Sequence, residues 1–161
     1  MADQFSLVYS APPVALLPAA ADAAGRTSAY RDLRNAHKAY VIAHVNQGNA
    51  ATVALSLMQA QDVLGTGAKA ISASMPIWYQ ANTATSDLNV AQAAAASFTT
   101  DVNLFDKIII FEILPETALD VANGFKTIAV VTGASNVANI TEAVLIAANA
   151  YQGASQPTTY A

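Results

Sequence analysis

The two histidines are the first residues to consider for chemistry, because imidazole serves both as a metal ligand and as a catalytic base. His37 and His44 are separated by an odd number of positions, so on one continuous strand they lie on opposite faces. Neither stands near a carboxylate at the spacing of a metal site. The chain has no cysteine, which excludes disulfides, thiol catalysis and cysteine-ligated zinc. We therefore predict no metal and no other cofactor.

A nucleophilic triad needs a hydroxyl, a histidine and a carboxylate in one cleft. Serines and threonines are numerous, but the chain contains no Gly-x-Ser-x-Gly elbow. Glu116 and Asp120 follow Pro115 at a spacing that allows them to share a helical turn, and a solvated loop explains them equally well. We predict that the chain is not an enzyme. The enzymatic alternative is a hydrolase, which would bring His37 or His44 beside an acid and a hydroxyl.

The glycines at 65 and 67 superficially resemble a phosphate-binding loop. A nucleotide loop has the pattern GxxxxGK followed by Ser or Thr. Here Ala68 separates Gly67 from Lys69, and Ala70 stands where the dinucleotide pattern GxGxxG has its last glycine. We therefore predict a tight turn between two strands and no nucleotide site.

Two adjacent aromatic residues form the last candidate ligand site. Trp78 and Tyr79 follow Pro76, and a pair of stacked aromatic rings is one way to bind a sugar. The other explanation is packing in the core or at the edge of a β-sandwich, where large aromatic side chains bury much area. We favour packing.

Composition limits the class of protein more firmly than any motif. The chain has 161 residues, enough for one domain. Only 11% of them are charged, against about 25% in a typical protein, and such a surface suits a protein that sits in an assembly. The net charge is −4, and Asp32 interrupts the densest basic stretch, from Arg26 to Lys38. We predict no nucleic-acid binding, because phosphate contacts need clustered cations.

The first residues do not read as a secretion signal or a membrane span. Residues 1–10 contain no Lys or Arg, so the positive start of a signal peptide is missing. The apolar run 11–21 is too short to cross a bilayer, and prolines interrupt it. We predict no membrane partner, and a fold without disulfides is compatible with the cytoplasm. Because proline fixes φ and removes a donor, residues 1–29 are expected to form an extended arm outside the fold.

The rest of the chain reads as short strands between Gly and Asn turns. The stretch 82–97 is expected to be a loop or a short helical turn, because Ala91–Ala96 lacks large residues to anchor a helical face. The segment 141–150 is ambiguous between helix and strand, and we predict a strand that completes the sheet. Strands are expected at 38–45, 52–58, 69–71, 76–79, 98–100, 107–113, 125–131 and 141–150.

These strands predict an all-β fold, a single jelly-roll-like β-sandwich, since no long amphipathic helices alternate with them. The segment 107–113 is the strongest strand, and its near-continuous apolar run predicts a central position with both faces buried. Replacing Ile110 with Asp is therefore expected to unfold the domain. The expected core comprises Val53, Leu55, Leu57, Ile108, Ile110, Phe111, Ile128 and Val130.

Several segments recur together in an order that has a known parallel. They are residues 30–39, 53–63, 65–70, 119–125, 134–140 and 144–147, followed by Tyr151. This order resembles a family of small structural proteins encoded among the head genes of tailed bacteriophages, over roughly residues 30–151. Lys126 departs from the family pattern, in which an acidic residue follows the Gly-Phe pair.

The resemblance implies a capsid decoration, or cement, protein on the outer surface of the virion. Its partners would be the major capsid protein and, in a homo-oligomer, further copies of the chain, and the particle would assemble in the host cytoplasm. The residues themselves predict an arm at 1–29, a β-sandwich at 30–151 and a loose tail at 152–161, and the resemblance covers only the β-sandwich. The alternatives are a carbohydrate-binding head fibre and a tail or neck component. The candidate capsid contacts are the apolar residues of the arm, Phe5, Leu7, Val8, Leu16 and Leu17.

Overall fold

The structure, a computed structural model, describes residues 7–149. Its strands are β1 (Pro13–Ala21), β2 (Arg26–Thr27), β3 (Arg31–Asp32), β4 (Ala36–Gln47), β5 (Ala54–Ala60), β6 (Lys69–Ala70), β7 (Met75–Gln80), β8 (Val90–Ala95), β9 (Ser97–Thr99), β10 (Asp106–Ile113), β11 (Thr127–Thr132) and β12 (Asn139–Asn149). Its helical segments are α1 (Leu7–Ser10), α2 (Pro115–Ala118) and the 3₁₀ turn η1 (Val121–Asn123).

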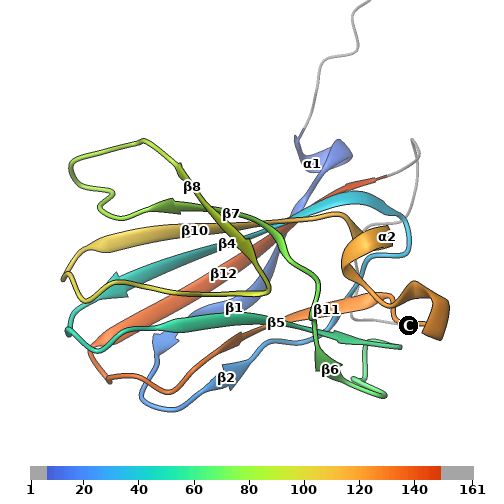
Figure 1. The fold of residues 1–161 in the computed structure, drawn as a ribbon, viewed down its shortest axis with the longest axis horizontal. Helices are drawn as coiled ribbons and strands as arrows, with labels where there is room; N and C mark the ends of the chain where they lie inside the picture. Colours follow the sequence, from blue (N-terminus) through green and yellow to red (C-terminus); the bar gives the residue numbers. More distant parts are fainter. Residues whose placement is uncertain (1–6, 150–161) are drawn as a thin grey trace, which may run out of the picture.

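Two antiparallel sheets pack face to face (Figure 1). The first sheet has the strand order β1-β12-β4-β10-β7-β8. The second has the order β2-β11-β5-β6, with β3 also paired to β11 and β9 to β5. The chain crosses repeatedly between the two sheets, for example from β4 to β5 and from β11 to β12. The predicted all-β sandwich is therefore confirmed.

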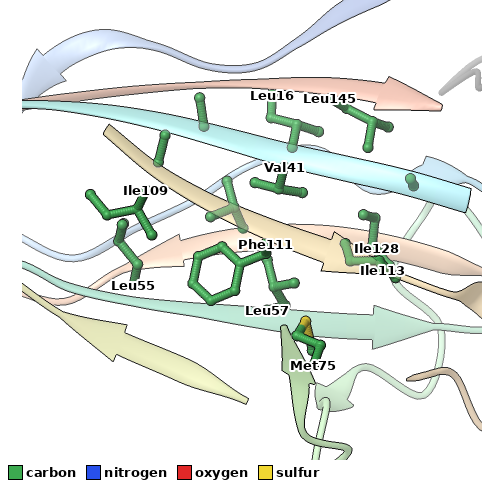
Figure 2. Close-up of a cluster of buried hydrophobic side chains, with 14 of the residues drawn as sticks. Leu16, Val41, Leu55, Leu57, Met75, Ile109, Phe111, Ile113, Ile128 and Leu145 are labelled. Atoms are coloured by element: carbon green, nitrogen blue, oxygen red, sulfur yellow. The ribbon is translucent and has the colours of Figure 1, made fainter. Parts of the chain in front are cut away.

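The core lies between the sheets and follows the two-residue alternation of the strands. On β4 the inward residues Ala39, Val41, Ala43 and Val45 are buried, while Tyr40, Ile42 and His44 between them are only half-buried. Figure 2 shows Phe111 from β10 among the inward side chains of the facing strand β5. Small alanines on β4 opposite large side chains let the two layers pack closely.

Eight expected strands coincide with strands of the structure, namely β4 to β7 and β9 to β12. The ambiguous segment 141–150 forms β12 as far as Asn149, between β1 and β4. This assignment is confirmed over the part of the segment that the structure describes. Its alternation of buried Thr141, Ala143 and Leu145 with outward residues is the periodicity of a strand, not of a helix.

The expectation of a loop or helical turn at Ala91–Ala96 is wrong. Residues Val90–Ala95 form β8, which pairs with β7 from Tyr79 opposite Val90 to Met75 opposite Ala95. A register shift between Met75 and Ile77 marks a bulge in this pair. The alanines adopt a strand because β7 offers an unpaired edge, so tertiary pairing outweighs their weak strand propensity.

The expectation that the fold begins at residue 30 also fails for the described part of the arm. Pro13–Ala21 form β1, an edge strand of the first sheet, and Leu16 and Leu17 are both buried in the core. Adjacent residues normally face opposite sides of a sheet, but register shifts at Leu17 indicate bulges that turn both side chains inward. Pro13 and Pro18 are tolerated because an edge strand needs donors on one side only.

The strand β10 is buried on one face and partly open on the other. Ile109, Phe111 and Ile113 face the core, whereas Ile108 and Ile110 are half-buried on the outer face of the first sheet. The placement of Ile108 and Ile110 in the core was therefore wrong, and so is the reason for expecting Ile110→Asp to unfold the domain. The other expected core residues, Val53, Leu55, Leu57, Phe111, Ile128 and Val130, are buried as predicted.

Candidate interaction surface

The two histidines lie on the same strand, β4, but have different surroundings. His44 is half-exposed on the outer face of the first sheet, with Nδ1 3.3 Å from Glu142 Oε1. His37 lines a cavity of about 390 Å³ beside α2, together with Glu116, Arg34 and Lys126. The lining of this cavity contains no hydroxyl side chain, so the arrangement required by the hydrolase alternative is not met there. Among the described residues no cluster of three potential metal ligands occurs.

The turn predicted around Gly65 and Gly67 is confirmed. It joins β5 to β6, and both glycines have positive φ, at 86° and 65°. Asp62 organises the turn: its Oδ1 accepts the backbone N–H groups of Leu64 and Thr66, and its Oδ2 accepts the Thr66 hydroxyl at 2.6 Å. The hydrogen bond from the Thr66 hydroxyl is the main reason that the pKa of Asp62 lies below its ordinary value. These contacts account for the motif as a structural turn.

Glu116 and Asp120 do not share a helical turn. The helix α2 ends at Ala118, and Asp120 instead accepts from Lys69 Nζ at 2.6 Å. Lys69 also lies 4.1 Å from the centre of the Phe125 ring. The hydrogen bond from Lys69 is the main reason for the lowered pKa of Asp120. Through these two contacts, Lys69 links β6 to the segment before β11.

Trp78 and Tyr79 point to opposite sides of the first sheet and cannot form one aromatic platform. Tyr79 faces inward against Phe98, with ring centroids 4.8 Å apart, and its hydroxyl donates to Asp101 Oδ2 at 2.7 Å. Burial, followed by this bond to a carboxylate, raises the pKa of Tyr79. Trp78 faces outward and is 37% exposed. The packing explanation is confirmed for Tyr79, while Trp78 belongs to the outer surface.

Around Trp78 the outer face of the first sheet is unusually apolar. Trp78, Ile110, Ile42 and Val144 stand opposite one another on four neighbouring strands. The next row places Tyr40 between Glu112 and Ile146. Apart from Val144, the residues of these two rows line a groove of about 560 Å³, together with Leu7, Ala11, Asn89 and Ala148. We call it the outer groove. Among the described residues that line it, Glu112 alone is charged, and it forms an ion pair with Lys38.

The edge strand β8 borders this region and is also free of charge. No charged residue occurs between Asp87 and Asp101. Leu88, just before the strand, is 65% exposed and Val90 is 50% exposed. Among the described residues β8 pairs only with β7. Gln92 Nε2 donates to Val90 O at 3.2 Å, a local contact that a backbone N–H from another strand can replace.

The opposite edge of the same sheet is blocked. On β1 the carbonyl of Ala15 accepts from Arg31 Nη2 at 2.8 Å, and those of Pro18 and Ala20 accept from Arg26 at 3.0 and 2.9 Å. Pro18 also has no N–H to offer. Natural sheets protect their edges with charged side chains and prolines in this way. The contrast makes β8 the accessible edge of the first sheet.

The candidate capsid contacts of the arm fall into three groups. Leu16 and Leu17 are buried core residues, so their assignment as surface contacts is wrong. Leu7 is exposed and lines the outer groove. Phe5 and the side chain of Val8 lie outside the described residues, as do residues 152–161.

The chain was compared with protein families, curated proteins and solved structures. No family model, no curated protein and no solved structure matches it. In residues 7–149, no helix has the length and apolar character needed to span a bilayer. No similar protein therefore indicates a ligand or partner for the candidate surface.

Sequence reasoning missed both β8 and the outer groove. Alanine carries little strand signal, so β8 was hidden, although the absence of charge from 88 to 100 marked it as unusual. The groove depends on cross-strand register, which brings together residues such as Trp78 and Ile146 that are remote in sequence. The outward apolar residues between inward ones on β4 and β10 were the available signal, since a solvent-facing strand normally alternates with polar residues.

Proposed function

We propose that this chain is a virion structural protein of a tailed bacteriophage that decorates the capsid. It binds the major capsid protein through β8, which adds an extended segment of a capsid subunit to the first sheet. The observation that carries this proposal is the open, uncharged edge of β8. The sequence resemblance to phage head proteins supplies the identity of the partner.

Strand addition suits an edge of this composition. Backbone hydrogen bonds provide affinity in such complexes, and alternate side chains provide specificity. Each hydrogen bond contributes a net ~0.5–1.5 kcal/mol, so a few bonds along β8 give a weak contact that the exposed Leu88 and Val90 strengthen. A stable interface buries about 800 Å² per partner. A capsid offers many equivalent sites, so a modest contact at each site is enough for dense coverage.

In the part of the chain that the structure describes, β8 has no charged residue, no proline and no second strand to protect it, and this is the strongest argument that it has a partner. A long, exposed and uncharged edge is an aggregation site unless something covers it. The chain protects its other edge with two arginines and a proline. Leaving β8 unprotected is consistent with an edge that is used.

The proposal is tested by placing a charge on the edge. Ala91 is exposed on β8, and Ala91→Lys should weaken binding to capsid shells assembled without this protein by about tenfold or more, equivalent to ~1.4 kcal/mol. Ala68→Lys makes the same substitution at an exposed position in the β5–β6 turn and should bind like the unaltered protein. Co-sedimentation with the shells measures both. Equal binding by the two variants would reject β8 as the docking edge, and no binding by the unaltered protein would reject the decoration function.

A further inference from the structure

The outer groove is an apolar surface that the described residues leave open. Its lining is mostly apolar and comes largely from β4, β7, β10 and β12, with Asn89 and Glu112 as polar members. On a monomeric protein such a patch normally has an occupant or a partner. The chain itself indicates the occupant.

The strand β12 carries the chain directly to the groove. Outward-facing Ile146 and Ala148 are lining residues, and Asn149 is the last residue of the strand. Residues 150–161 therefore start immediately beside the groove. At about 3.3 Å per residue they reach roughly 40 Å. The groove crosses from β12 through β4 and β10 to β7, about 15 Å at the usual strand spacing.

The composition of residues 150–161 matches the groove. They contain Tyr151, Tyr160 and Pro157 and no charged side chain. Tyrosine has a large apolar ring with a polar tip, which suits an apolar floor that is open to water on one side. The other segment next to a lining residue, residues 1–6 before Leu7, includes the charged Asp3, which suits an apolar floor less well. The 150–161 segment is the better match in both length and charge.

We propose that residues 150–161 dock in the outer groove of their own chain and cover Trp78. A tether this short gives an effective concentration of about 1 mM. A contact with a dissociation constant of ~0.1 mM would then be occupied roughly 90% of the time. The inference concerns the free protein and does not depend on capsid binding.

Trp78 is the only tryptophan of the chain, so its fluorescence reports on the groove alone. The test compares the full chain with a full-length Y151S/Y160S variant, and with Tyr30→Ser as a control for loss of a tyrosine elsewhere. Acrylamide should quench Trp78 at least about twofold less in the full chain and in the control than in the double variant. The double variant should also emit at longer wavelength, because its indole faces water.

A synthetic peptide of residues 150–161, added at roughly millimolar concentration, should restore protection to the double variant. Circular dichroism establishes that all three proteins are folded. Equal quenching of the full chain and the double variant would overturn the proposal. Protection that disappears on dilution from micromolar to nanomolar protein would also overturn it, because the segment would then come from a second copy.

Discussion

Replacing Lys107 with Met should destabilise the fold strongly while keeping the shape of the core. The Lys107 ammonium is fully buried. It donates to Gln47 Oε1 at 2.8 Å, to Asp101 Oδ1 at 2.8 Å and to the carbonyls of Asp101 and Asn103 at 3.0 and 2.6 Å. Gln47 continues the network by accepting the Thr100 hydroxyl at 2.8 Å. This network fastens the loop that carries the chain from β9 to β10.

The magnitude follows from what the substitution leaves behind. Methionine fills the space of the lysine stem but removes every donor, so the acceptors lose their partner. Removing one member of a buried ion pair costs about 3–5 kcal/mol. The Asp101 side chain is 36% exposed, so water can solvate it again, and we expect about 3 kcal/mol. With a urea m-value near 2 kcal/mol/M, the unfolding midpoint should fall by roughly 1.5 M.

The pH dependence provides a second readout. Burial acts to raise the pKa of Asp101, but hydrogen bonds from Lys107, Tyr79 and the Asn103 amide outweigh burial and lower it. A carboxyl whose pKa is lower in the folded state stabilises the fold above its unfolded pKa of about 3.9, and this stability is lost as the pH falls through the folded pKa. The variant lacks the largest of these hydrogen bonds. It should therefore lose less additional stability between about pH 5 and pH 2 than the unaltered protein.

Urea unfolding followed by circular dichroism measures both effects, with Lys126→Met as the control for loss of a lysine that is not fully buried. A destabilisation by Lys107→Met below about 1 kcal/mol would refute the reasoning, because it lies under the range for a broken buried pair. An unchanged acid dependence would show that Lys107 does not lower the pKa of Asp101.

Three further predictions use the same unfolding measurement. Asp22 is fully buried and accepts from Arg26 Nη2 at 3.0 Å, so Asp22→Ala should cost about 3–5 kcal/mol, and a loss under ~1 kcal/mol would contradict this role. Ile109→Asp places a charge in the core and should unfold the protein, whereas Ile110→Asp on the outer face should leave it folded. The same outcome for both variants would refute the assignment of the two faces of β10. Gly124 has φ 82°, so Gly124→Ala should cost about 1 kcal/mol or more, and no change in midpoint would mean that this conformation carries no strain.

The elements that could be predicted from sequence are those in which side chains alone specify a strand. The segment 107–113 is rich in isoleucine, and Pro115 stands two residues after it. This segment forms most of β10. Which isoleucines face the core could not be read from it, because a continuous apolar run hides the alternation. The structure resolves this by pairing β10 with β4 and β7, which sets Ile109 inward and Ile110 outward.

The elements that could not be predicted owe their conformation to a neighbour. The proline-rich β1 forms a strand because β12 pairs with it and bulges accommodate its prolines. The alanine-rich β8 forms a strand because β7 has a free edge. The candidate surface depends on these two types of information, strand pairing and register, and neither is contained in local composition. This is why sequence reasoning placed contacts at Leu16 and Leu17, which turned out to be core residues.

A reconstruction by electron cryo-microscopy of capsid shells mixed with this protein tests the proposed decoration function most directly. The expected result is copies of the β-sandwich on the outer surface of the shell, with an extended capsid segment hydrogen-bonded along Val90–Ala95. A shell without the chain would contradict the proposed function. A bound chain whose β8 edge faces solvent, with the contact made elsewhere, would contradict the proposed mode of docking.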